Sequence, residues 1–364
     1  MIETPPTHTL NRPVHGGNLA WAAAIAGCSP DSLLDFSASI NPLGPPNSVM
    51  EAMAEALGQL CYYPDPDYGA LRQALASYHS LSADWVLPGN GAAELLTWAA
   101  RDLAKIGCCC LLTPAFGDYG RALASFDVPI RPWVLPDSGV ATSDLFPLPQ
   151  PEGASGILIN NPHNPTGRLF TAASLESLLE RFAMVVVDEA FMDFVLPDRQ
   201  QSLVGYLDRY PNLVVLRSLT KFYSLPGLRL GYALGHPDRL RRWQRWRDPW
   251  PVNTLAAAAA IAAVSDTAFQ TRTWQWLPTA RQKLFDGLQA TPGLSPAAGA
   301  ANYLLVKTTL PAPLLQERLL HSHQVLIRDC LSFAELGLDY FRVAVRTETE
   351  NDRLLTALSQ GLGV

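Results

Sequence analysis

The feature that most constrains the fold is a series of short, continuous apolar runs that alternate with segments of helical character. Two examples, Met184–Asp188 and Leu213–Arg217, consist largely of aliphatic residues without the alternation of a half-exposed strand. The other strand candidates in this region are Asp35–Ile40, Cys108–Leu112, Ile157–Asn160 and Leu230–Leu234, and the helical candidates are Ser48–Leu57, Leu71–Tyr78, Glu94–Leu103 and Tyr119–Phe126. This pattern predicts an α/β fold with a mostly parallel sheet between helices. Such sheets bind ligands at the carboxyl ends of their strands.

The sequence changes in character near residue 250. A long helical region, Thr254–Leu288, leads into an α+β pattern. Its strand candidates are Asn302–Lys307, Val325–Arg328 and Phe341–Val345, and Asn351–Leu362 is a closing helix. The first 35 residues read as a loosely ordered arm. We therefore expect an N-terminal arm (1–45) packing with a small domain, a large domain (46–250), and a long connecting helix with that small C-terminal domain (251–364).

Composition limits the classes of partner. The 364 residues carry a formal net charge of −6 with no basic stripe, so we expect no nucleic-acid partner. The longest apolar run, Thr254–Val264, is short of the roughly 20 residues that span a membrane, and no signal peptide is recognisable, so we expect a cytoplasmic protein. The six cysteines form no C-x-x-C pair, and consecutive residues of a strand point to opposite faces, so we expect no metal site.

One lysine stands in an unusual setting. The chain has only four lysines, and Lys221 follows a predicted strand in the string RSLTKFYSLPGLRLG. A hydroxyl (Ser218), an amine and a guanidinium (Arg229) at the end of a parallel strand would make a phosphate site with a nucleophile beside it. A lone lysine in a loop is most often a solvated surface cation, and it is the surrounding pattern that favours chemistry here.

Three further strings follow or precede predicted elements. Asn160–Gly167 (NNPHNPTG) is a turn-rich loop directly after a strand. Asp188 ends a buried apolar strand, where a carboxylate needs a partner such as a cationic ring nitrogen, although a helix cap or a metal ligand also fits. Pro88–Glu94 is a glycine-containing turn that runs into a helix and could hold a phosphate on its backbone N–H groups, although a simple tight turn has the same sequence.

In this order and spacing, NPHNPTG, VVVDEA and SLTKFYSLPGLRLGY resemble the fold-type I pyridoxal 5'-phosphate (PLP) enzymes, in the aminotransferase class that includes histidinol-phosphate aminotransferase. The resemblance extends from about residue 15 to residue 362. Within the class, HGGN at 15–18, LDFSASINPLG at 34–44 and the segment 217–232 look most like the L-threonine-O-3-phosphate decarboxylase family of cobalamin biosynthesis, the CobD type. The segments 327–330 and 340–344 are also similar to that family.

The resemblance implies a set of cofactor contacts. Lys221 would form the Schiff base with PLP, Asp188 would pair with the pyridine nitrogen, and Asn164 would bind the ring hydroxyl. Phe116 would stack on the ring. The groups that would hold the cofactor phosphate are the backbone of Gly91, Ala92 and Ala93 and the side chains of Ser218 and Arg229. Tyr63 would reach the cofactor phosphate of a neighbouring subunit, which implies a homodimer. Taken without the resemblance, Phe116 and Tyr63 fit core packing better.

The resemblance also implies a small phosphorylated amino-acid substrate. The residues expected to contact it are His15, Gly16, Ser39, Asn164, Arg328 and Arg342. The two arginines suit the carboxylate and the phosphate, but the sequence leaves open which binds which, and structural ion pairs are an alternative for both. Two positions depart from the relatives: Phe191 stands where aminotransferases often have Tyr, and Ser39 where the decarboxylases often have Asn.

Three hypotheses follow. The leading one is PLP-dependent decarboxylation of L-threonine O-3-phosphate to (R)-1-aminopropan-2-yl phosphate and CO₂, with Lys221 as the acid that protonates Cα. The second is an aminotransferase such as histidinol-phosphate aminotransferase, which uses nearly the same cofactor residues. The third is a non-catalytic protein of the same fold, and the intact Lys221, Asp188, Asn164 and Arg229 argue against it.

Overall fold

The computed structural model describes residues 12–135 and 155–364. Its largest sheet has the order β2-β8-β7-β6-β5-β3-β4. These strands are β2 (Val86–Asn90), β3 (Cys109–Thr113), β4 (Ile130–Val134), β5 (Gly156–Asn160), β6 (Met184–Asp188), β7 (Leu213–Ser218) and β8 (Leu230–Gly235). Strand β8 runs antiparallel to β2 and β7, and the other neighbours pair in parallel. The prediction of an α/β fold with a mostly parallel sheet is confirmed.

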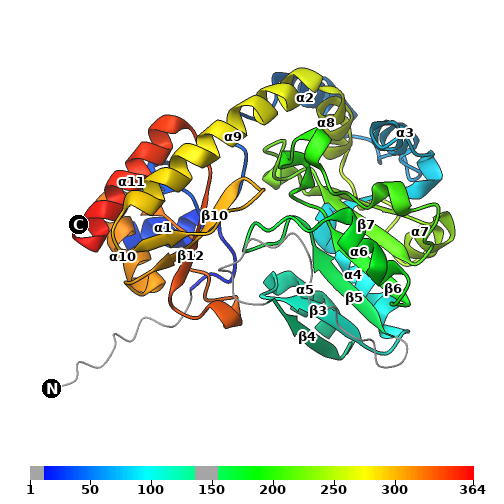
Figure 1. The fold of residues 1–364 in the computed structure, drawn as a ribbon. Helices are drawn as coiled ribbons and strands as arrows, with labels where there is room; N and C mark the ends of the chain where they lie inside the picture. The colour runs from blue at the N-terminus through cyan, green and yellow to red at the C-terminus, as the bar shows by residue number, and fades with distance from the viewer. Residues whose placement is uncertain (1–11, 136–154) are drawn as a thin grey trace.

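Helices cover both faces of this sheet (Figure 1). One face packs against α4 (Gly91–Ala104), α5 (Gly117–Ala124) and α7 (Pro237–Gln244), and the other against α3 (Gly69–Tyr78), α6 (Ala172–Leu179) and α8 (Thr254–Ser265). Neighbouring strand residues enter the two cores alternately, so Cys109 belongs to the first and Cys110 to the second. Burial on both faces explains why the strands are continuously apolar.

The C-terminal part is built on a smaller antiparallel sheet of order β12-β10-β9. Its elements are β9 (Leu294–Pro296), β10 (Tyr303–Thr308), β12 (Tyr340–Ala344), α10 (Ala312–His323) and α11 (Glu348–Leu362). Helix α9 (Thr267–Ala290) extends from the region of α2 (Asn47–Ala56) and α8 to this sheet (Figure 1). The predicted single helical region Thr254–Leu288 is therefore two helices, because Asp266 ends α8 and caps α9 through the N–H of Phe269.

The prediction of a loosely ordered N-terminal arm is wrong for residues 19–35. Helix α1 (Leu19–Ala26) packs on α10, and β1 (Leu34–Asp35) pairs in parallel with β11 (Val325–Leu326). A small apolar cluster that includes Ala22 accounts for the order. The predicted strand Asp35–Ile40 is correspondingly short, since only its first residue is in β1.

The described residues also form short 3₁₀ helices. These are Pro30–Ser32, Leu57–Gln59, Ala83–Trp85, Met192–Phe194 (η4), Pro197–Arg199 (η5), Val204–Tyr206, Pro226–Leu228 and Ala334–Leu336.

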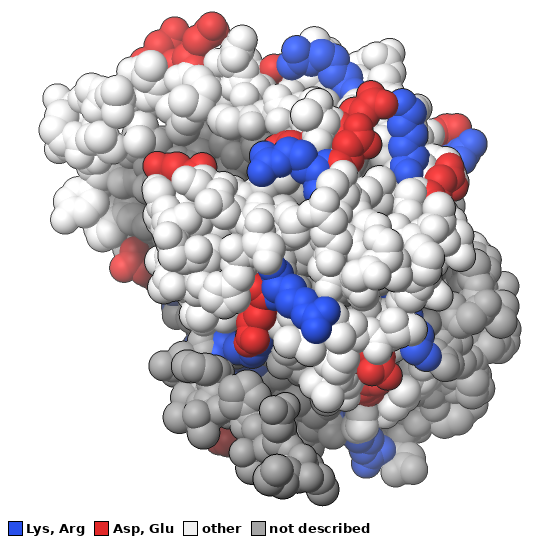
Figure 2. All heavy atoms as spheres, turned by 90° about the vertical axis from the view of Figure 1, so that its left-hand side faces the viewer, with Lys and Arg blue, Asp and Glu red and all other residues white. Residues whose placement is uncertain are grey.

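The surface of the C-terminal part carries charges of both signs. Seen from the side of α10 and α11, Lys and Arg side chains alternate with Asp and Glu side chains (Figure 2). Within residues 12–135 and 155–364, no helix is long and apolar enough to cross a lipid bilayer. One pocket lies at the carboxyl ends of β2, β3, β5, β6 and β7, where the C-terminal part approaches the large sheet.

Candidate active site

A pocket of about 340 Å³ surrounds the side chain of Lys221. The lysine lies in the loop after β7, and its carbonyl accepts a hydrogen bond from the N–H of Asn41 at 3.0 Å. The side-chain amide of Asn41 donates to the carbonyl of Phe222 at 2.9 Å, which fixes the loop on both sides. Burial, with the nearby positive charges of Arg342 and Arg229, lowers the pKa of Lys221 to about 8. About a tenth of this amine is therefore neutral and nucleophilic at pH 7, far more than for a lysine with its ordinary pKa.

Asp188 ends β6 and points a carboxylate into the same pocket. Its Oδ2 accepts a hydrogen bond from the Tyr119 hydroxyl at 2.8 Å, and its Oδ1 accepts one from the N–H of Ala190 at 3.0 Å. Burial raises the pKa of Asp188 above its ordinary value. The second contact closes a turn within the chain and does not cap a helix, because the N-cap of the following η4 is Phe191. No group of three or more possible metal-ligating side chains occurs in the described residues.

The loop after β5 positions Asn164 by hydrogen bonds within its own sequence. The N–H of Asn164 donates to Asn160 Oδ1 at 2.7 Å. The amide side chain of Asn161 bonds both the N–H and the carbonyl of Phe170, which closes the loop. The Asn164 side-chain oxygen accepts a hydrogen bond from the Arg342 guanidinium. The asparagine-rich string therefore makes a rigid support rather than a flexible turn.

A second group of residues forms a cradle suited to an anion. Helix α4 starts at Gly91 without a side-chain cap, so its first N–H groups remain available. Gly91 has φ +75°, and a Cβ there would lie 2.6 Å from the Arg229 guanidinium. The Ser218 and Thr220 hydroxyls lie 2.7 Å apart at the same edge. Glycine is required at 91 by both the backbone angle and the close approach of the arginine.

Two arginines approach the pocket from the C-terminal part. Arg328 and Arg342 pair backbone to backbone, with N–H to carbonyl distances of 3.0 and 2.8 Å. Both side chains are buried, and burial lowers both pKa values. Neither forms an ion pair with any residue in the described ranges. Within the described residues, therefore, the two arginines are not members of structural ion pairs.

The N-terminal arm reaches the pocket because Arg328 holds it. The Arg328 guanidinium donates to the carbonyls of Pro13, at 3.1 Å, and Val14. This places the ring of His15 5.2 Å from that of Phe116, and burial lowers the pKa of His15. A Cβ at Gly16 would lie 2.3 Å from the Ser37 carbonyl oxygen, so the arm can lie this close only with glycine.

Most of the site residues expected from the sequence line one pocket. They are His15, Gly16, Ala92, Ala93, Phe116, Asn164, Asp188, Ser218, Lys221, Arg229, Arg328 and Arg342. Gly91 lies directly behind this lining. Ser39 is buried outside the lining with its hydroxyl unpartnered among the described residues. Tyr63 is not part of this lining: it is 79% exposed and stacked on Trp250 at a ring-centroid distance of 4.4 Å.

Sequence reasoning assigned no role to five polar residues of the pocket: Ser37, Asp118, Tyr119, Asn160 and Thr220. Tyr119 had a usable signal, because it lies three residues after Phe116 at the start of a predicted helix, and such positions share a face. Phe191 lines the pocket as expected and packs edge to face on Tyr303 at 4.9 Å. Phe191 has no hydroxyl where aminotransferases often have that of a Tyr. The neighbouring Tyr303 does not replace it freely, because the Tyr303 hydroxyl donates to the His163 carbonyl at 2.9 Å.

These groups fit PLP in number and chemistry. The α4 N-terminus, Ser218 and Arg229 suit a phosphate, and the depressed pKa of Lys221 suits an amine that attacks an aldehyde. The Asp188 carboxylate, whose pKa is raised by burial, suits a ring nitrogen that carries a proton.

Comparisons with known proteins agree with this geometry. The family model described as aminotransferase class I and II matches residues 31–358. The threonine-phosphate decarboxylase of Salmonella typhimurium is 41% identical over 351 residues, which cover 94% of this chain and 95% of that protein. The histidinol-phosphate aminotransferase of Symbiobacterium thermophilum is 34% identical over 344 residues, 91% of each.

Among solved structures, the histidinol-phosphate aminotransferase of Sinorhizobium meliloti in complex with PLP has the same fold. Its TM-score is 0.82 at 21% identity, with 98% of each chain covered. Fold, site and family model together define a PLP-dependent enzyme: the chain belongs to the class I and II aminotransferase family. Its cofactor is PLP.

Proposed function

We propose that this protein is a PLP-dependent decarboxylase that converts L-threonine O-3-phosphate to (R)-1-aminopropan-2-yl phosphate and CO₂ in cobalamin biosynthesis. The observation that supports this most directly is the pair of buried, carboxylate-free arginines, Arg328 and Arg342, in one pocket with Lys221. This substrate carries two anionic groups, a carboxylate and a phosphate. The 41% identity to the Salmonella threonine-phosphate decarboxylase over nearly both whole chains supports the same activity.

We assign the cofactor to the residues around Lys221. The amine of Lys221 is its covalent attachment point, and Asp188, Asn164 and Phe116 contact its ring. The backbone of α4 at Gly91, Ala92 and Ala93, with Ser218 and Arg229, holds its phosphate. When bound, PLP takes up the electron pair that is left at Cα as CO₂ departs.

The protein selects which bond breaks by holding the two anions of the substrate. Arg342 lies in β12 and Arg328 two residues after β11, and an isolated bridge joins them, so two planar guanidinium groups line the same pocket. His15 and Gly16 close the pocket near Arg328 and contact the substrate from the arm, and Asn164 completes the set within the lining. Ser39 lies outside the lining, and its contact with the substrate stays a prediction. Fixing both anions fixes the orientation of the Cα–carboxylate bond, and this is where a decarboxylase differs from an aminotransferase.

Lys221 replaces the lost carboxylate with a proton. One C–C bond breaks to release CO₂, and one C–H bond forms at the same carbon, so the step needs an acid within the pocket. With a pKa of about 8, the Lys221 amine can both release and take up a proton near neutral pH. His15 is a weaker candidate for the acid, since burial and the neighbouring Arg328 lower its pKa.

An aminotransferase acting on histidinol phosphate is the alternative, and the 34% identity to the Symbiobacterium enzyme favours it. The test compares two reactions of the PLP-loaded protein: L-threonine O-3-phosphate without an oxo acid, and histidinol phosphate with 2-oxoglutarate. Aminopropanol phosphate in the first reaction alone supports the proposal. Glutamate in the second reaction alone would replace it with the aminotransferase.

We further propose a cytoplasmic homodimer. Tyr63 and Trp250 form an exposed aromatic stack, and Leu60 and Tyr62 are exposed beside it, which suits a subunit interface. In this arrangement Tyr63 reaches the cofactor phosphate of the neighbouring subunit. We also propose the three-part division into arm (1–45), PLP-binding domain (46–250), and connecting helix with small domain (251–364).

A further inference from the structure

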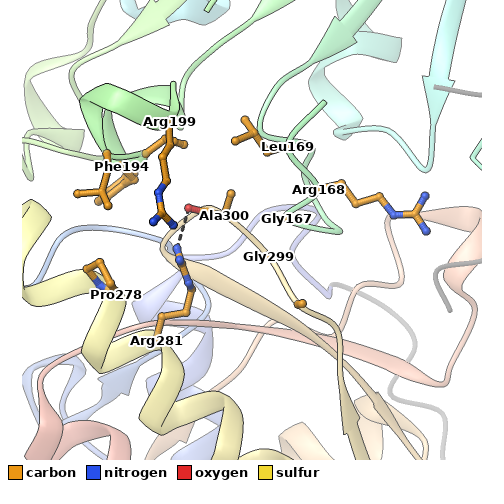
Figure 3. Close-up of a pocket in the computed structure, with 12 residues that line it drawn as sticks. Gly167, Arg168, Leu169, Phe194, Arg199, Pro278, Arg281, Gly299 and Ala300 are labelled. Carbon is orange, nitrogen blue, oxygen red and sulfur yellow. Dashed lines mark hydrogen bonds between the residues drawn. The ribbon is translucent and has the colours of Figure 1, made fainter. Parts of the chain in front are cut away.

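A second pocket, of about 380 Å³, shares no lining residue with the catalytic pocket. Its walls come from the loop after β5 (Gly167–Leu169), the segment 194–199 around η5, helix α9, and the loop 298–300 between β9 and β10. The loop after β5 and the segment 194–199 belong to the part of the chain that forms the large sheet. Helix α9 and the loop 298–300 belong to the C-terminal part. The pocket therefore lies at the junction of the two parts (Figure 3).

Two guanidinium groups converge on this pocket. Figure 3 shows the side chains of Arg199 and Arg281 pointing toward one another, while that of Arg168 points away from them. Arg281 is fixed in place, because its guanidinium donates to the carbonyls of Ala300, at 2.7 Å, and Ala301, at 3.1 Å. Arg199, at the end of η5, is exposed and directed into the same space.

Neither of these two guanidinium groups forms an ion pair with a residue of the described ranges. Asp198 precedes Arg199 in the chain but makes no ion pair with it. The contrast with buried structural arginines is clear: Arg217 binds the carboxylates of Glu189 and Asp193 at 2.8 and 2.5 Å. Two guanidinium groups directed into one cavity, without a carboxylate on either in the described residues, leave positive charge that an anion between them would neutralise.

The remaining walls indicate what kind of anion fits. Phe194, Val195 and Leu196 contribute an apolar wall, and Pro278 of α9 contributes apolar surface opposite. A doubly charged group matches two guanidinium groups, each able to donate two parallel hydrogen bonds. We propose that this pocket is a second anion site, which binds a small phosphate monoester. Arg199 and Arg281 bind its phosphate, and its apolar part packs against the segment 194–196. The site is independent of the proposed catalytic function.

Titration calorimetry of the PLP-loaded protein with phenyl phosphate tests the proposal. We expect two sites in the wild-type protein, one in each pocket. Arg199→Gln removes no contact within the described fold, and it weakens one site at least tenfold while leaving the other unchanged. Arg281→Gln weakens the same site, and Arg342→Gln weakens only the catalytic one.

Arg245→Gln is the matched control, because Arg245 is an exposed arginine at the end of α7 outside both pockets. It leaves both affinities at their wild-type values. Wild-type binding at two sites in Arg199→Gln would overturn the proposal. A single site in the wild-type protein that disappears in Arg342→Gln would overturn it as well.

Discussion

Arg328 and Arg342 lie opposite one another across an isolated antiparallel bridge, joined by backbone hydrogen bonds of 3.0 and 2.8 Å. Like charges in directly opposed positions destabilise a sheet. Here both side chains are also buried, with no carboxylate partner in residues 12–135 and 155–364. The pairing is explained if the two guanidinium groups bind an anionic substrate in the pocket that they line together with Lys221.

Arg342→Gln is expected to weaken substrate binding far more than cofactor binding. Loss of a charge-assisted hydrogen bond pair raises KM for L-threonine O-3-phosphate by at least tenfold, about 1.5–3 kcal/mol. The affinity for PLP changes less than threefold, as measured by titration of cofactor absorbance. Equal losses of both affinities would make Arg342 a structural residue. Arg353→Gln, on the exposed side of α11, is the control.

The same variant should cost less stability than the loss of a buried ion pair, since the group that loses its donor is the neutral side-chain oxygen of Asn164 and not a carboxylate. Arg217→Met is the contrasting change, because it leaves the buried carboxylates of Glu189 and Asp193 without their arginine. Breaking a buried ion pair on one side costs about 3–5 kcal/mol. Urea unfolding of both variants checks the comparison, and equal losses of unfolding free energy would contradict it.

The depressed pKa of Lys221 predicts a pH-dependent stability of the cofactor-free protein. Its pKa falls from 10.5 in the unfolded chain to about 8 in the fold, so between these values the unfolded chain binds more protons. Stability from this residue therefore rises with pH across that window and is reduced below it. Lys221→Met removes the effect. The variant should therefore be more stable than the wild-type protein at pH 7, and this difference in unfolding free energy should shrink between pH 8 and 10.5. A stability difference that does not vary with pH would refute the assignment.

Tyr119→Phe tests the hydrogen bond to Asp188. The Tyr119 hydroxyl lowers the pKa of Asp188 against the opposing effect of burial, and its loss makes the carboxylate a weaker partner for the cofactor ring. We expect kcat to fall about tenfold, the equivalent of about 1.4 kcal/mol, with KM nearly unchanged. Tyr210→Phe, whose hydroxyl bonds Glu176 away from the pocket, serves as control. A rise in KM without a fall in kcat would place Tyr119 in substrate binding instead.

Lys221→Ala separates an enzyme from a non-catalytic protein of the same fold. The variant should lose turnover completely yet retain PLP, because Asp188, Ser218 and Arg229 remain. Its absorption band should shift from that of covalently attached cofactor to that of free PLP. Turnover at the wild-type rate would show that another residue is the attachment point.

The central strands and the site loops could be predicted because their sequences report burial directly. Strand β6 is continuously apolar and ends in Asp188, and the structure buries it on both faces. Strand β4 was missed, because at the sheet edge its Ile130–Val134 is largely exposed and contains Pro132. Strand β2 was interpreted as a turn because Pro88 and Gly89 fall inside it.

The contacts between distant segments could not be predicted from local sequence. The contact of Arg328 with Pro13 and Val14 joins residues more than 300 positions apart. Likewise, the Tyr119–Asp188 hydrogen bond depends on the packing of α5 against the sheet. Helix α1 is different, because its alanine-rich sequence lies between an Asn18 N-cap and a left-handed Gly27, which are local signals that predict a helix. Packing against α10 adds to these signals.

The most direct measurement follows the carboxyl carbon of the substrate. L-Threonine O-3-phosphate labelled in its carboxyl group with carbon-14 is incubated with the PLP-loaded protein in the absence of any oxo acid. The account predicts many turnovers, with one labelled CO₂ released for each aminopropanol phosphate formed. Retention of the label in a soluble oxo or amino acid, with no labelled CO₂, would contradict it.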